Sequence, residues 1–173
     1  AASEYLIGLG DAETAIGSPF EVASRHYERA LKLAPTAGAA FIGRGKLAFA
    51  HQRHDEALHC FTAATSLLPT VGTAWLLLGA TQSVAAAMHG ESLRHEAVTS
   101  LKRAATLMPA DADVHWQLGD AHAQRAERRL AVESFAAAVR LQPGHVEAYS
   151  SIARVVGYEV LNLRAARLAL RCY

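Results

Sequence analysis

The chain has 173 residues, enough for one globular domain or one short repeat array. Hydrophobic residues make up 51% and charged residues only 19%, so the fold must bury apolar surface efficiently or leave some for a partner. A net charge of +1 argues against nucleic acid as the main ligand, because phosphate binding needs a surplus of Lys and Arg on one face. No apolar run is long enough to span a bilayer, so we expect no membrane insertion.

The chain opens with Ala1-Ala2-Ser3-Glu4, without a basic leader or an initiating Met. We therefore expect no signal peptide, and we consider the chain a candidate piece of a longer protein. Its two cysteines, Cys60 and Cys172, lie far apart and form no CxxC pair. They are interpreted as buried small hydrophobic residues, which favours a reducing compartment such as the cytoplasm.

Four prolines mark a repeating unit along the chain. Pro35, Pro69, Pro109 and Pro143 are separated by 34, 40 and 34 residues, and each has an Ala five residues before it. Further positions recur in register, namely a glycine (Gly10, Gly45, Gly79, Gly119), a small residue (Ala23, Ala57, Ala97, Ala131) and a large apolar residue (Tyr27, Phe61, Leu101, Phe135). A period of this size indicates a repeat architecture.

This pattern resembles the tetratricopeptide repeat family, and the resemblance covers nearly the whole chain. It implies an all-α fold, a right-handed superhelical solenoid of antiparallel helix hairpins. We expect one array over residues 1–173, with repeats near 3–36, 37–70, 71–110, 111–144 and 145–173. The glycine and the alanines would let paired helices approach closely, and the aromatic residue would fill the gap between neighbouring hairpins. Each proline would end a hairpin.

Ten helices are expected, near residues 3–15, 19–33, 37–51, 54–67, 72–88, 92–107, 112–125, 128–141, 145–158 and 161–172. A capping box is predicted where Ser18-Pro19-Phe20-Glu21 opens the second helix. Asp111 is a good N-cap for the seventh. The last helix carries leucines on more than one side and no polar capping helix follows it, so either the parent chain continues or another protein covers this end.

The third repeat is six residues too long, and the excess falls between Gly79 and Ala97. Its alanine run favours a longer first helix that projects beyond the neighbouring hairpins. Two interpretations stay open. The excess is either a tolerated insertion or a dedicated contact for one partner.

In this family, the first helices of successive hairpins line a concave groove that binds other proteins. The resemblance places there, in chain order, Ile42, Lys46, Phe49, Leu76, Ala80, Ser83, Trp116, Gln117, Asp120, Gln124, Ser150, Arg154 and Tyr158. We expect Lys46, Phe49, Leu76, Trp116, Gln117, Asp120 and Arg154 to contact the partner. Trp116 either anchors the ligand or packs between hairpins.

Some family members hold the carboxylate tail of a heat-shock chaperone with a Lys/Asn/Asn/Lys/Arg clamp. The matching places here are Ile7, Asp11, Gly43, Thr73 and Leu77, none of which carries the required residue. The next three-repeat frame fails in the same way. We therefore disfavour that ligand.

Catalytic, cofactor and metal sites are not expected. The sequence has no GxSxG, HExxH or phosphate-binding loop motif. His51 and His54 lack a carboxylate or cysteine to complete a tetrahedral metal site, so solvated histidines are the better interpretation. The leading hypothesis is a non-enzymatic scaffold or adaptor that binds a protein or peptide. The alternatives are a non-catalytic, substrate-recruiting segment of a larger enzyme and a structural subunit of a large assembly.

Overall fold

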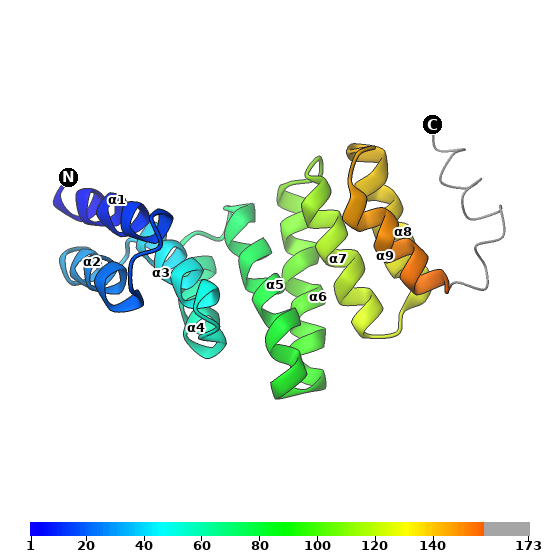
Figure 1. The fold of residues 1–173 in the computed structure, drawn as a ribbon, viewed down its shortest axis with the longest axis horizontal. Coiled ribbons are helices and arrows are strands. Elements are labelled where there is room, and N and C mark those ends of the chain that lie inside the picture. The colour runs from blue at the N-terminus through cyan, green and yellow to red at the C-terminus, as the bar shows by residue number, and fades with distance from the viewer. Residues whose placement is uncertain (158–173) are drawn as a thin grey trace.

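The computed structural model describes residues 1–157, which form nine α-helices and no β-strand. The helices are α1 (Ala2–Ala15), α2 (Phe20–Leu33), α3 (Gly38–Ala50), α4 (His54–Leu67), α5 (Gly72–His89), α6 (Glu91–Leu107), α7 (Ala112–Gln124), α8 (Arg128–Leu141) and α9 (Val146–Val156). Consecutive helices pair into four hairpins that stack in chain order, and α9 packs beside α7 and α8 (Figure 1). The predicted all-α repeat solenoid is confirmed, while the tenth predicted helix lies outside the described residues.

The prolines set the ends of the second helices. α2, α4, α6 and α8 each stop two residues before a proline. The residue between each helix end and its proline has a φ angle between −141° and −127°. These residues are Ala34, Leu68, Met108 and Gln142. Such angles are expected before proline, because its ring clashes with a helical conformation of the preceding residue. For α1 to α9, the predicted first and last residues agree with the structure to within two residues.

The two predicted helix caps have different outcomes. Asp111 caps α7 as expected, because its carboxylate accepts hydrogen bonds from the backbone N–H groups of Asp113 at 3.0 Å and Val114 at 3.3 Å. The capping box at Ser18 is wrong. Pro19 occupies the N-cap position of α2, which has no side-chain cap, and the Ser18 hydroxyl instead donates to the Glu13 carboxylate. The turn after α1 brings these two residues together through a backbone hydrogen bond from Ser18 N to Glu13 O.

The recurring residues form the core. The four register alanines, Ala23, Ala57, Ala97 and Ala131, are at most 1% exposed, and so are the four large residues that follow them. In the fourth hairpin a Cβ on Gly119 would lie 2.5 Å from the Phe135 ring. The glycine is therefore required by the aromatic residue of its own hairpin. Tyr27 contacts the glycines of two hairpins, Gly10 and Gly43, so the expected filling between hairpins is seen there as well.

The third hairpin is longer than the others. α5 has 18 residues and α6 has 17, whereas the other described helices have 11 to 14. Gly90 joins the two with a positive φ of 88°, which an L side chain rarely adopts. The hairpin extends beyond its neighbours at this end (Figure 1), as predicted, and Met88 near its tip is 74% exposed.

Two further expectations concern the cysteines and membrane insertion. Cys60 is buried, as predicted, and burial raises the pKa of its thiol to about 11, so it stays protonated at neutral pH. Cys172 lies outside the described residues. Within residues 1–157, none of the helices has both the length and the apolar character required to cross a bilayer.

Candidate partner-binding site

The first helices of the hairpins lie next to one another. α1 contacts α3, α3 contacts α5, α5 contacts α7 and α7 contacts α9. Successive second helices make no contact of similar extent within the described residues. Elements of a curved stack approach each other most closely on its inner side. A partner-binding groove along the first helices stays a prediction.

On α3, the predicted binding residues are accessible. Lys46 is exposed and has no ion pair with another described residue. Phe49 is 37% exposed and meets the His54 ring edge-to-face at a centroid distance of 5.6 Å. A free cation and an accessible aromatic ring therefore lie one turn apart on the same helix.

Leu76 and Gln117 are less accessible than the α3 residues. Both are half-buried, and Leu76 packs onto a cluster formed by Val98, Leu101, Leu118 and Ala121. Much of the Leu76 side chain is therefore used by the core. Tyr158, the last residue expected on the groove, lies outside the described residues.

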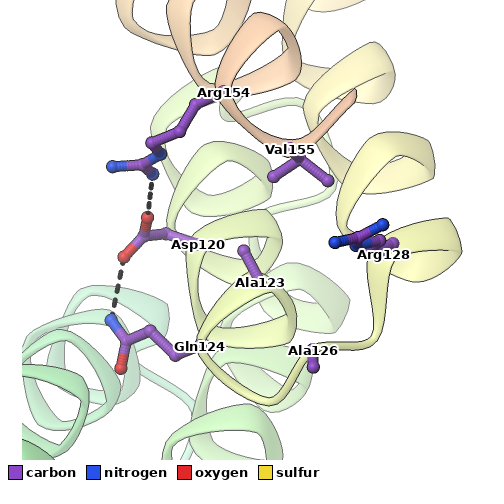
Figure 2. A pocket seen from close by; sticks show the side chains of 7 residues that line it. All are labelled: Asp120, Ala123, Gln124, Ala126, Arg128, Arg154 and Val155. Atoms are coloured by element: carbon purple, nitrogen blue, oxygen red, sulfur yellow. Dashed lines mark hydrogen bonds and ion pairs between the residues drawn. The ribbon is translucent and has the colours of Figure 1, made fainter. Parts of the chain in front are cut away.

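Three polar residues from two first helices form a row (Figure 2). Arg154 on α9 donates to Asp120 on α7 at 2.7 Å, and Gln124 donates to the other oxygen of the same carboxylate at 2.9 Å. Both carboxylate oxygens thus have a donor. The structure brings together Asp120 and Arg154, which were predicted separately, and this ion pair bridges the fourth and fifth repeats.

Trp116 connects the same two repeats. It is half-buried against Ala112, Ala138, Val139 and Ala148, and its indole N–H donates to the Ser151 hydroxyl at 3.3 Å. These contacts agree with the second of the two roles considered for Trp116, packing between hairpins. The part of the ring that stays accessible is what a ligand could contact.

A pocket of about 450 Å³ lies beside this row, and sequence reasoning missed it. Asp120, Ala123 and Gln124 line it from α7, Ala126 and Arg128 from the turn and start of α8, and Arg154 and Val155 from α9. Figure 2 shows Arg128 across the pocket from the Arg154–Asp120–Gln124 row. An adjoining hollow of about 400 Å³ shares Arg128 and Val155. The pocket thus joins charged groups to a small apolar wall.

The turn that carries Arg128 has a defined backbone conformation. Ala126 adopts a left-handed φ of 58°, the Ala126 N–H donates to the Ala123 carbonyl at 2.9 Å, and the Glu127 N–H donates to the His122 carbonyl at 3.0 Å. This pair of hydrogen bonds is a Schellman motif, which usually has Gly at the left-handed position. The same motif follows α1, at Gly17, and α3, at Gln52. An alanine gave no sequence signal for it.

A buried histidine supports that turn. His122 is 3% exposed, and its Nδ1 lies 2.5 Å from a carboxylate oxygen of Glu127, whose other oxygen accepts from Arg125 at 2.9 Å. The hydrogen bond with His122 lowers the pKa of the Glu127 carboxyl, and the nearby positive charges of Arg125 and Lys102 add to this, although desolvation opposes it. Glu127 is therefore anionic at neutral pH.

A second buried histidine connects repeats four and five. His145 is 4% exposed, and its Nδ1 accepts from the Ala148 N–H at 3.2 Å as the N-cap of α9. Its Nε2 lies 3.1 Å from Asp113 on α7. Its Nδ1 also lies 3.3 Å from a carboxylate oxygen of Glu147, so the ring contacts carboxylates of both α7 and α9. Solvation, expected for the histidines in general, is therefore wrong for these two.

No metal site was expected from the histidines. Among residues 1–157, no group of three or more His, Cys, Asp or Glu side chains is arranged to hold a metal ion. His51 and His54 instead make edge contacts with aromatic rings, Phe20 and Phe49 respectively.

Residues 1–157 form an all-α helical repeat solenoid. Residues 7–70 match the family model described as tetratricopeptide repeat. Together with the structural neighbours, that match confirms the resemblance to the tetratricopeptide repeat family. No curated protein matches the sequence.

Several solved structures have the same fold. A crystal structure of MamA superposes with a TM-score of 0.78 at 25% identity, covering 94% of this chain and 89% of that one. A MamA from Desulfovibrio magneticus RS-1 gives a TM-score of 0.79 at 17% identity over 99% and 90%. YrrB, described as a TPR protein with an unusual peptide-binding site, gives 0.76 at 22% identity over 96% and 84%. These similarities confirm the helical repeat solenoid fold.

Proposed function

We propose that this chain is a non-catalytic scaffold that binds a peptide, or an extended segment of a partner protein, along the face formed by its first helices. The observation that carries the proposal is the free pair on α3. Lys46 has no ion pair with a described residue, and the Phe49 ring is more than a third exposed. Aromatic residues are enriched in the core of protein interfaces, and charged residues lie mostly at the polar rim.

The packing of the helices supports this location. Successive first helices contact one another, so side chains from different repeats lie close enough to contact a single peptide. The peptide-binding site of YrrB agrees with this use of the fold. Gln117 is proposed as an adaptable hydrogen-bonding group between the apolar part of the face and Asp120.

A matched pair of double variants tests the proposal. Lys46→Glu with Phe49→Ala changes the first-helix face, whereas Lys32→Glu with Leu33→Ala makes a similar change on the exposed end of α2. The unmodified chain is panned against a random peptide library, and the selected peptides are titrated against it and against both variants. We expect the α3 variant to lose about tenfold or more in affinity and the α2 variant to bind like the unmodified chain. Equal binding by all three proteins would contradict the proposal.

A further inference from the structure

The charges around the α7–α8–α9 pocket are not balanced. Three of the four arginines nearby have a carboxylate partner. Arg125 pairs with Glu127 at 2.9 Å, Arg129 with Glu133 at 2.9 Å and Arg154 with Asp120 at 2.7 Å. Arg128, which lines the pocket, has no carboxylate partner among the described residues. The pocket therefore holds two guanidinium groups and one carboxylate, a net charge of +1.

The one pocket carboxylate is already satisfied. Asp120 accepts from Arg154 through one oxygen and from Gln124 through the other, and its side chain is only 27% exposed. A lysine or arginine of a ligand would have to displace Arg154 to reach it. An incoming carboxylate displaces nothing, because Arg128 is exposed and offers a fork of N–H donors suited to two carboxylate oxygens.

We propose that this pocket binds an acidic side chain, Asp or Glu, of the peptide that occupies the first-helix face, with Arg128 as its main partner and Val155 and Ala123 against its methylene groups. The inference rests on the proposed function. Lys46, the unpaired cation on α3, favours the same ligand charge at the other end of the face. An internal side chain suits the position of the pocket beside the face, where a peptide can run past it.

The test uses octapeptides capped at both ends, so that only side chains carry charge. A random library of such peptides is passed over the immobilised chain, and the bound pool is sequenced. We expect enrichment of Asp or Glu at one position relative to the apolar residues. In the Arg128→Gln chain the enrichment should disappear, and the best acidic peptide should bind about tenfold more weakly, which corresponds to one lost charge-assisted hydrogen bond.

Two controls separate this effect from general changes. Arg140→Gln makes the same substitution in the last turn of α8, far from the pocket, and should keep the acidic preference. Replacing the acid of the selected peptide by its amide should give equal binding to the unmodified and Arg128→Gln chains. Arg154→Gln should weaken the acidic preference as well, because it leaves the Asp120 carboxylate without its cation.

The outcomes distinguish the two proposals. If peptides bind without acidic enrichment, or if enrichment survives Arg128→Gln, the pocket assignment is wrong while peptide binding by the face stands. If no peptide is retained, both proposals fail. Acidic selectivity that depends on Arg128 supports both, and it should weaken as ionic strength rises from about 0.1 to 1 M, where the Debye length falls from about 10 to 3 Å.

Discussion

Replacing Trp116 by alanine should destabilise the junction between the fourth and fifth repeats. The indole packs against Ala112 of its own helix, Ala138 of α8 and Ala148 of α9. A fully buried Trp→Ala change costs about 3–5 kcal/mol, and the half-buried ring should lose less than that. The hydrogen bond to Ser151 adds roughly 0.5–1.5 kcal/mol. We expect a total loss of about 2–4 kcal/mol in the free energy of unfolding.

Urea unfolding followed by circular dichroism measures this loss. Trp116→Phe keeps most of the packing and removes the N–H group, so it should cost about 1 kcal/mol. Combining it with Ser151→Ala in a double-mutant cycle isolates the hydrogen bond, for which we expect a coupling of about 0.5–1.5 kcal/mol. The same variants are titrated with a peptide selected on the unmodified chain.

Two results would refute this reasoning. A Trp116→Ala loss below about 1 kcal/mol would show that the ring contributes little to packing between repeats. If that variant also lost peptide affinity by about 2 kcal/mol or more, Trp116 would act as a binding hot spot instead. A double-mutant cycle without coupling would remove the Ser151 hydrogen bond from the explanation.

Four other substitutions should have measurable effects. Ala126→Gly should raise the free energy of unfolding by about 0.5–1 kcal/mol, because Gly relieves a left-handed strain of roughly 1–2 kcal/mol at a smaller entropic cost. Gly17→Ala should lower the free energy of unfolding. If denaturant unfolding showed both substitutions changing it in the same direction, this reasoning would be contradicted. Ala131→Leu should overpack a fully buried contact and cost about 1–3 kcal/mol, so an unchanged melting temperature would show that the register is wrong. The pKa of Glu127 is lowered in the folded chain through its bond to His122, so its contribution is present above the ordinary pKa near 4.5 and lost as pH falls through the folded value. Glu127→Gln should therefore lose less stability on acidification than the unmodified chain, and parallel pH profiles would refute the linkage.

The fold could be predicted from the sequence because its signals are local and repeat in phase. Each second helix ends two residues before a proline. The register alanine is buried in all four hairpins. A single copy of either signal would be weak, but four copies in register constrain one another. The predicted Ser18 cap is wrong because it depends on a contact outside the repeated pattern. The turn after α1 brings the Glu13 carboxylate close to the Ser18 hydroxyl, which donates to it instead of capping α2.

The site was less predictable because its properties depend on contacts between repeats. Register placed Trp116 and Arg154 on the first-helix face, but the environment of Trp116 depends on Ser151, 35 residues away, and Arg154 finds Asp120 across the same junction. The pocket at Arg128 was missed because the turn that forms it contains Ala126 where glycine would have indicated a left-handed residue. No spacing rule within one repeat reports such a pocket.

The long third hairpin has a consequence for the order in which the chain unfolds. α5 and α6 share the most extensive helix–helix interface among the described residues, and they lie in the middle of the array. In a linear array each unit is stabilised by itself and by its immediate neighbours only. The terminal units should therefore fray first, and the central amide hydrogens should exchange with solvent most slowly. We therefore expect amide hydrogen-exchange rates to be lowest along residues 72–107 and to rise toward both ends of the array, as for a chain that unfolds from its terminal repeats toward its centre.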